Sequence, residues 1–139
     1  MKFFFRLFMA FHVALYRLSG GQLGGGMGKT KVVLLTTTGR KSGKSYTLPL
    51  GGFERDGGYV IVASNGGQAA NPGWFYNLKS SPQAVLQVGP DRLSVTAEVL
   101  SGDARAQAWQ QVVSTAPSYA GYEQKTTREI PLVLLRPNQ

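Results

Sequence analysis

Short apolar runs, separated at regular intervals by turn residues, are the feature of this sequence that most limits its fold. Two of the turns, Asp56-Gly57-Gly58 and Gly89-Pro90-Asp91, are of the kind that joins the strands of a hairpin. Six runs rich in β-branched and apolar residues are predicted to be strands: 31–38, 45–53, 59–64, 85–88, 92–100 and 130–135. Six strands with short connections and few helices predict a mainly β protein, a closed or partly closed β-barrel with flanking helices.

Helical segments are predicted in three places. Residues 3–18 have apolar side chains over most of a helical wheel, with Lys2, Arg6 and Arg17 in one narrow sector. Residues 73–79 form a short helical turn, and residues 101–115 form a longer helix. One face of that longer helix carries Ala104, Ala108, Trp109, Val112 and Val113. The glycine-rich stretch 19–29 is expected to be a flexible linker or a wide turn, residues 65–72 a loop, and 119–125 a short segment.

The charge is concentrated in the first third of the chain. The sequence has 15 Lys+Arg against 7 Asp+Glu, a formal net charge of +8, and eight of the bases precede the first acid, Glu54. This imbalance predicts an anionic partner for the N-terminal part. The segment 3–18 is too short and too often charged to span a bilayer, so two readings stay open. It packs on its own domain, or it lies on an anionic membrane surface.

Two absences exclude whole classes of chemistry. The chain has no cysteine and a single histidine, His12, so thiolate metal sites, disulfides and multi-histidine metal sites are impossible, and no metal is expected. Two stretches that resemble a phosphate-binding P-loop lack its spacing or the helix that must follow it. Redox or group-transfer chemistry would therefore have to come from a bound organic cofactor or an oxygen-ligated metal.

Two loops carry the candidate site. The turn at 39–45 offers Arg40, Lys41, the Ser42 hydroxyl and Lys44 with no acid among them, which favours an anion cradle over a merely solvated turn. The glycine-containing loop after residue 63 leads to Trp74, which could form the wall of a site for a planar ligand or belong to the core. Two tyrosines, Tyr119 and Tyr122, share one face of the short segment near the C-terminus.

Four motifs make the chain recognisable: TTTGRKSGKSYTLPL, VIVASNGG, NPGWFYNL and YAGYEQKTTREIPLVLL. In order and spacing they resemble the deazaflavin-dependent nitroreductase and quinone reductase family. Its members are small actinobacterial oxidoreductases that use reduced coenzyme F420 and have a split, FMN-binding-like β-barrel. The resemblance covers about residues 29–137. It leaves residues 1–28 as a separate helix and linker before a coenzyme-binding domain at 29–139.

The resemblance implies a role for each motif. The basic turn would hold the phosphate and glutamyl tail of the coenzyme, and the strand after it would run along the deazaflavin ring. The later loop would line the rest of the site, and the tyrosines would face the substrate. The implied coenzyme-binding residues are Arg40, Lys41, Ser42, Lys44, Tyr46, Thr47, Leu48, Pro49, Leu50, Val62, Ala63, Ser64, Asn65, Trp74, Asn77 and Tyr119. Candidate proton donors are Tyr119, Tyr122 and Ser64. Asn65 replaces a lysine expected in quinone-reducing members, and Gly73 replaces a bulkier residue.

The function implied is transfer of a hydride from reduced F420 to a quinone-like or nitroaromatic acceptor. Alternatives that keep the site are an F420-binding or storage protein with little turnover and a split barrel that binds FMN. Nucleic-acid binding rests on charge alone and is not expected. A homodimer is an open alternative for the assembly. The expected location is the cytoplasm, with contact to the inner face of the membrane through residues 3–18 as a further alternative.

Overall fold

Antiparallel pairing joins every strand in the computed structural model, which describes residues 26–27 and 30–138. The strands are β1 (Gly26–Met27), β2 (Thr30–Thr38), β3 (Ser45–Arg55), β4 (Gly58–Val62), β5 (Gln83–Val88), β6 (Asp91–Val99) and β7 (Leu132–Pro137). The helices are η1, a 3-10 turn at Asn65–Gly67, then α2 (Gly73–Ser80), α3 (Gly102–Thr115) and α4 (Ser118–Gln124).

Pairing between β2 and β5 closes the sheet on itself. The strand order is β1-β2-β3-β4-β7-β6-β5, and β5 then pairs with β2 at Leu34↔Gln87 and Thr36↔Val85. The six strands β2 to β7 thus form a closed barrel. Along the paired residues, neither β2 nor β5 has a free edge. The two-residue strand β1 pairs only with the start of β2, at Gly26↔Lys31. The predicted barrel is confirmed.

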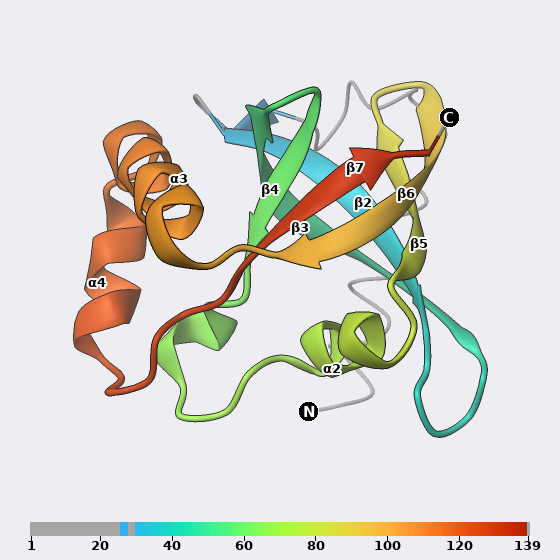
Figure 1. Cartoon of the computed structure of the whole chain (residues 1–139), viewed down its shortest axis with the longest axis horizontal. Helices are drawn as coiled ribbons and strands as arrows, with labels where there is room; N and C mark the ends of the chain where they lie inside the picture. Colours follow the sequence, from blue (N-terminus) through green and yellow to red (C-terminus); the bar gives the residue numbers. More distant parts are fainter. Residues whose placement is uncertain (1–25, 28–29, 139) are drawn as a thin grey trace.

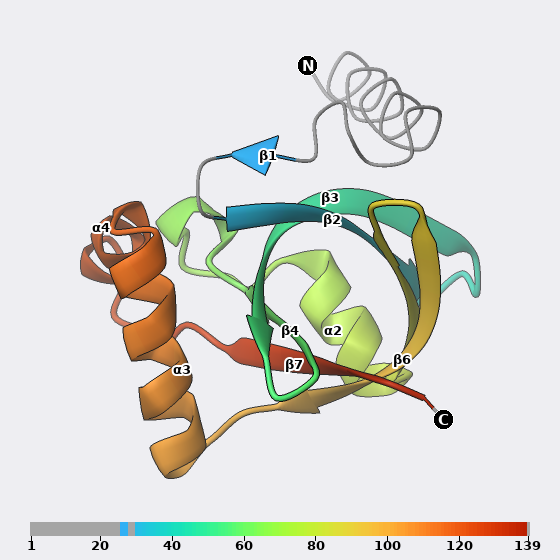
Figure 2. The ribbon, with the colours of Figure 1, turned by 90° about the horizontal axis from the view of Figure 1, so that it is seen from above.

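The barrel interior is filled by alternate residues of its strands and by one helix. Inward-facing aliphatic side chains from β2, β4, β5 and β7 are fully buried: Val33, Leu35, Ile61, Leu86, Val133 and Leu135. Helix α2 lies across one end of the barrel, as the two perpendicular views show (Figure 1, Figure 2). It places Trp74, Phe75 and Leu78 in the same core. Helix α2 therefore lies at the same end of the barrel as the turn between β2 and β3.

A second core lies outside the barrel wall. Successive residues of a strand point to opposite faces, so Val60 and Val62 of β4 face outward where Ile61 faces inward. Helices α3 and α4 cover this outer face together (Figure 1). Trp109 of α3 and Tyr119 of α4 pack into this cluster. The barrel is consequently covered by helices on one side near the loop that follows β4.

The strand predictions are confirmed to within about two residues at each end, the usual accuracy of boundaries. The expected loop at 65–72 contains the turn η1, and the undetermined segment at 119–125 is the helix α4. Ala104, expected on the buried face of α3, is exposed because the contact face narrows to Ala108, Trp109 and Val112. Part of the stretch 19–29, expected to be linker, forms β1. A pairing of two residues leaves no periodic signal.

The predicted helix at 3–18, with the membrane contact suggested for it, lies outside the described residues. In residues 26–27 and 30–138 no helix is long and apolar enough to cross a membrane.

Candidate functional site

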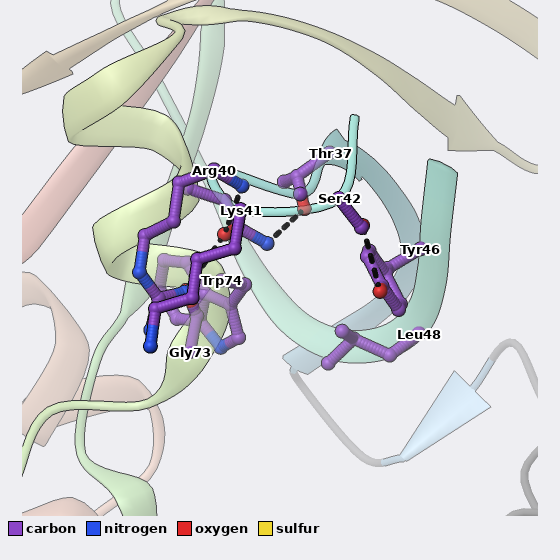
Figure 3. A pocket seen from close by; sticks show the side chains of 10 residues that line it. Thr37, Arg40, Lys41, Ser42, Tyr46, Leu48, Gly73 and Trp74 are labelled. Atoms are coloured by element: carbon purple, nitrogen blue, oxygen red, sulfur yellow. Dashed lines mark hydrogen bonds between the residues drawn. The ribbon is translucent and has the colours of Figure 1, made fainter. Parts of the chain in front are cut away.

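A chamber of about 420 Å³ opens between the turn that follows β2 and the start of α2. Figure 3 shows Arg40 and Lys41 reaching from the turn beside Gly73 and Trp74, with Tyr46 and Leu48 of β3 on the other side. The lining residues are Thr37, Gly39, Arg40, Lys41, Ser42, Tyr46, Leu48, Gly73, Trp74 and Asn77. Two of these are cations and none is an acid, so this chamber favours an anionic ligand.

Arg40 is held in place by the buried side chain of Asn77. The backbone N–H of Arg40 and its Nη1 both donate to Asn77 Oδ1, at 3.2 and 2.9 Å. Asn77 Nδ2 in turn donates to the Oγ1 of buried Thr37, at 3.1 Å. Nη1 also reaches the carbonyl of Gly73 at 3.3 Å, and the guanidinium lies 5.4 Å from the ring centroid of Tyr76. One asparagine therefore links β2, the turn and α2.

The shape of the turn depends on a glycine. A Cβ placed on Gly39 would lie 2.5 Å from Cε2 of Tyr46 and 2.7 Å from Oγ of Ser42, closer than atoms can approach. The hydroxyls of Ser42 and Tyr46 are hydrogen-bonded at 3.0 Å, and the Lys44 N–H donates to Ser42 Oγ at 3.2 Å. Gly43 adopts a φ of +72°, the left-handed region that glycine favours. The turn is thus shaped by contacts among its own residues.

A second chamber, of about 430 Å³, adjoins the first. Its lining residues are Leu48, Leu50, Gly51, Val62, Ser64, Asn65, Gly66, Gln68, Pro72, Trp74 and Tyr119. Leu48 and Trp74 line both chambers, so the two chambers are neighbours; together they are called the groove below. No charged residue lines the second chamber among the described residues, in contrast to the first. The groove therefore changes from cationic to uncharged along its length.

The pleat of β3 decides which of its residues reach the groove. Tyr46, Leu48 and Leu50 line it, whereas Thr47 and Pro49 between them do not. Thr47 instead shares a hydrogen bond of 2.7 Å with Thr36 Oγ1 on β2. The sequence motif names five consecutive residues, but only alternate side chains can face one side of a strand.

The two tyrosines of α4 occupy different positions. Tyr119 lines the second chamber and meets the ring of Phe53 edge-on at 5.8 Å. Tyr122 lines neither chamber; its ring packs edge-on against Tyr119 at 5.6 Å, and Lys125 Nζ lies 5.7 Å from its centroid. Burial raises the pKa of the Tyr119 hydroxyl above its ordinary value, and the nearby Tyr122 raises it further. Tyr119 is therefore a neutral hydrogen-bonding group at physiological pH.

The structure brings most of the expected binding residues together. Lys44, Thr47, Pro49, Ala63 and Tyr122 are the expected site residues whose side chains line neither chamber. Lining residues that the motif reading did not name are Thr37, Gly39, Gly51, Gly66, Gln68, Pro72 and Gly73. Gly39, Gly66 and Gly73 lie within the quoted motifs. A glycine has no side chain whose chemistry could mark it as a lining residue.

Comparisons with known proteins give matches over most of the chain. Residues 8–137 match the family described as F420H(2)-dependent quinone reductase, a match that begins well before residue 29. An F420H(2)-dependent quinone reductase of Mycobacterium tuberculosis is 40% identical over 129 residues, which are 89% of this chain and 86% of the relative. A solved F420-H2 dependent reductase is 42% identical with a TM-score of 0.70, covering 76% of this chain and 93% of that one. A solved domain-swapped dimer is 35% identical with a TM-score of 0.74, covering 91% and 93%.

Proposed function

This chain belongs to the F420H(2)-dependent quinone reductase family, and on that basis we propose how its residues bind the coenzyme and the acceptor. It is an oxidoreductase whose coenzyme is F420 and whose acceptor is a quinone. The observation that carries the assignment of residues is the change in charge along the groove. A cationic chamber and an uncharged chamber share Leu48 and Trp74. In a ligand with an anionic tail and a planar ring, the tail would suit the cationic chamber and the ring would suit the uncharged chamber.

The first chamber fits the phosphodiester and carboxylates of the coenzyme tail. Arg40 uses Nη1 to bind Gly73 and Asn77, while its Nε and Nη2 make no hydrogen bond with the described residues. Lys41 is exposed at the same rim. These free donors can bind oxygen anions without moving the turn, because Asn77 already holds the guanidinium. Ser42 contributes a hydroxyl to the same wall.

The second chamber fits the planar ring and the acceptor. Leu48, Leu50, Val62 and Trp74 give it apolar walls, and glycines on two sides allow a flat ligand to approach the backbone. When bound, the reduced coenzyme supplies the hydride. The chain's own contribution is to hold ring and acceptor in contact and to exclude water from between them.

Tyr119 is proposed to hydrogen-bond the acceptor. Its raised pKa keeps the hydroxyl protonated, so it can donate to a quinone oxygen. The same shift makes it a weak proton donor, because an acid with a pKa well above neutral releases its proton poorly. We therefore assign Tyr119 to orienting the acceptor, with Ser64 of the same chamber as a second donor. Tyr122 would act through its contact with the Tyr119 ring.

A two-stage experiment tests the proposal. Fluorescence titration of the purified protein with F420 measures binding, and mixing with reduced F420 and menadione measures turnover by the return of F420 absorbance. Arg40→Ala with Lys41→Ala should weaken F420 binding more than about tenfold and weaken a tailless deazaflavin much less. Equal losses for both ligands would show that the turn does not bind the tail. Binding without acceptor-dependent oxidation, over a panel of quinones and nitroaromatics, would contradict the reductase role.

Three further properties are proposed. Nitroaromatics are proposed as additional acceptors because the uncharged chamber selects by shape rather than by charge. A homodimer is proposed from the relative solved as a domain-swapped dimer, and light scattering tests it.

Membrane contact by residues 3–18 rests on the charge pattern alone. Deletion of residues 1–28 should reduce binding to anionic liposomes. The same deletion tests the domain boundary, since it removes β1 from β2 and should leave the closed barrel folded.

A further inference from the structure

Arg128, in the segment between α4 and β7, binds four separate groups of the loop that follows β4. Its Nη2 donates to the carbonyls of Ala63 and Ser64, at 3.2 and 2.8 Å. Its Nη1 donates to Asn71 Oδ1 at 2.7 Å, and its Nε donates to the carbonyl of Gln68 at 3.1 Å. One guanidinium thus contacts both ends of the loop 63–72 from a point about 60 residues away in sequence.

That loop is one wall of the uncharged chamber, to which it contributes Ser64, Asn65, Gly66 and Gln68. Its backbone is unusual: φ is +50° at Asn65 and +65° at Gly66, and the turn is closed by short local bonds such as Gly67 N–H to Ser64 O at 2.9 Å. A loop of this kind has no strand ladder to hold it. The Ala63 N–H donates to the Pro131 carbonyl at 2.9 Å, and η1 packs against α4. Arg128 adds side-chain hydrogen bonds at four further points, which tie both ends of the loop to one guanidinium.

The charge of Arg128 is not neutralised by an acid. Its hydrogen-bond acceptors are three carbonyls and an amide oxygen, and within the described residues it makes no ion pair. The adjacent Glu129 pairs instead with Arg105, at 3.2 Å. Arg128 lines neither chamber, but it binds the carbonyls of Ser64 and Gln68, two residues that line the chamber without charged residues. Charge–charge interactions in such a setting are screened less than at an open surface.

A quinone that accepts a hydride becomes an anion before it becomes a hydroquinone. The acceptor gains one hydrogen nucleus and two electrons as a C–H bond of the reduced coenzyme breaks and a bond to hydrogen forms on the acceptor. The coenzyme is oxidised, and one quinone oxygen carries the negative charge until a proton from solvent or a nearby hydroxyl neutralises it. A positive charge close to the chamber favours this anion more than it favours the neutral quinone.

We propose that Arg128 is a positioning residue for the reduction, which fixes the loop wall of the chamber and provides the positive charge that favours the anionic product. This inference rests on the proposed function for the identity of the acceptor. The attachment of the loop is a property of the protein without any ligand. The two parts can therefore be tested separately.

The test compares Arg128→Lys, which keeps the charge, with Arg128→Gln, which keeps part of the hydrogen bonding and loses the charge. In the ligand-free protein, amide hydrogen exchange at residues 64–71 should speed up by about tenfold or more in both variants, because both lose bonds to the loop. With reduced F420 and menadione, Arg128→Gln should lower kcat at least about fivefold more than Arg128→Lys does, with similar KM values for the acceptor.

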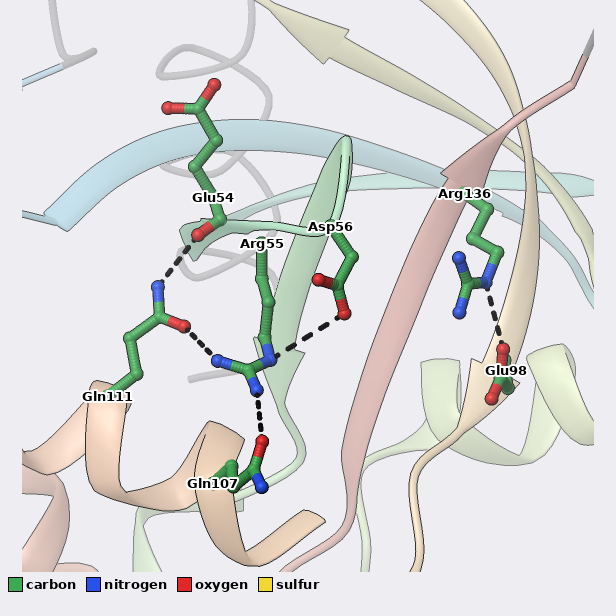
Figure 4. Close-up of polar contacts among 7 residues, drawn as sticks. All are labelled: Glu54, Arg55, Asp56, Glu98, Gln107, Gln111 and Arg136. Carbon is green, nitrogen blue, oxygen red and sulfur yellow. Dashed lines mark hydrogen bonds and ion pairs between the residues drawn. The ribbon is translucent and has the colours of Figure 1, made fainter. Parts of the chain in front are cut away.

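Arg55 offers a matched control. It donates to Gln111 Oε1 at 3.0 Å and Gln107 Oε1 at 3.3 Å, and its Nε lies 3.9 Å from Asp56 Oδ2 (Figure 4). Arg55 therefore attaches α3 to β3, as Arg128 attaches the loop, but its charge is paired with an acid and it does not line the groove. Arg55→Gln should lower the melting temperature while leaving kcat and exchange at residues 64–71 unchanged.

Three outcomes would overturn the proposal. Unchanged exchange at residues 64–71 in a folded Arg128 variant would refute the attachment. Equal kcat for the Lys and Gln variants would refute the role of the charge. Equal effects of the Arg55 and Arg128 variants on kcat would show that Arg128 affects the reaction only through the stability of the fold. A wild-type protein without turnover would instead contradict the proposed function, and the exchange experiment would still decide the first part.

Discussion

Replacing Asn77 by alanine should destabilise the protein far more than removal of one exposed polar group would. The change deletes three hydrogen bonds at once: two from Arg40 and one to Thr37. The side chains of Asn77 and Thr37 are 7% and 2% exposed, so water cannot easily replace the bond between them. The loss of stability therefore depends on how well water can hydrogen-bond to each group that Asn77 leaves unpaired.

The three bonds contribute unequally. The Thr37 hydroxyl, left buried and unpaired, costs about 1–2 kcal/mol, and the half-buried N–H of Arg40 costs about 1 kcal/mol. The Arg40 side chain is exposed and can be hydrated, so its guanidinium bond adds only about 0.5 kcal/mol. The expected loss is about 3 kcal/mol in the free energy of unfolding, or roughly 9 °C in Tm for a chain of this length.

Urea unfolding of Asn77→Ala, Thr37→Val, Arg40→Ala and the Asn77/Arg40 double variant measures these contributions. Thr37→Val should lose about 1–2 kcal/mol, because it leaves the Asn77 amide unpaired, and Arg40→Ala should lose less than about 1 kcal/mol. The Asn77/Arg40 pair should show a coupling of about 0.5 kcal/mol. A loss below about 1 kcal/mol for Asn77→Ala would refute the reasoning, because the bonds would then be replaced by water.

Three further changes have expected outcomes. Gly39→Ala should move the Tyr46 ring and lower F420 affinity by about tenfold, whereas Gly121→Ala, whose new Cβ meets no atom within 4 Å and lies outside both chambers, should leave affinity within about twofold by fluorescence titration. Tyr119→Phe should flatten the fall of Tm above about pH 10. A raised pKa stabilises the fold below the unfolded value of about 10, and that stability is lost as pH rises through the folded value. Gln111→Ala removes bonds from Arg55 and to the Glu54 carbonyl and should lower the free energy of unfolding by about 1 kcal/mol without changing F420 binding.

The barrel could be predicted from the sequence because each strand carries its own signal. Around the hairpin turn before Gly58 and in the apolar run at 130–135, hydropathy and turn residues both indicate a strand. Closure between β2 and β5 left no such mark, because pairing partners about 50 residues apart share no local pattern. The two-residue strand β1 was missed for the same reason.

The site was predictable in composition and not in its arrangement. The basic turn and Trp74 were identifiable from residue type, and the groove places both of them on its walls. The motif could not show that Thr47 faces Thr36 instead of the groove, since that depends on the pleat of β3. Nor could it single out Arg128, whose four acceptors are mostly backbone carbonyls that no residue type reveals.

The positive charges around the groove fall into two groups with different physical roles. Arg40 and Lys41 line the cationic chamber, where they face a ligand directly and would discriminate by charge before any reaction. Arg128 is turned away from the groove, toward carbonyls that leave its charge unneutralised, so it would act on charge that develops during the reaction. Loss of the first pair should therefore appear mainly in the Kd of the coenzyme, and loss of Arg128 mainly in kcat. The net charge of the N-terminal third accounts for only the first of these effects, because Arg128 lies in the balanced part of the sequence.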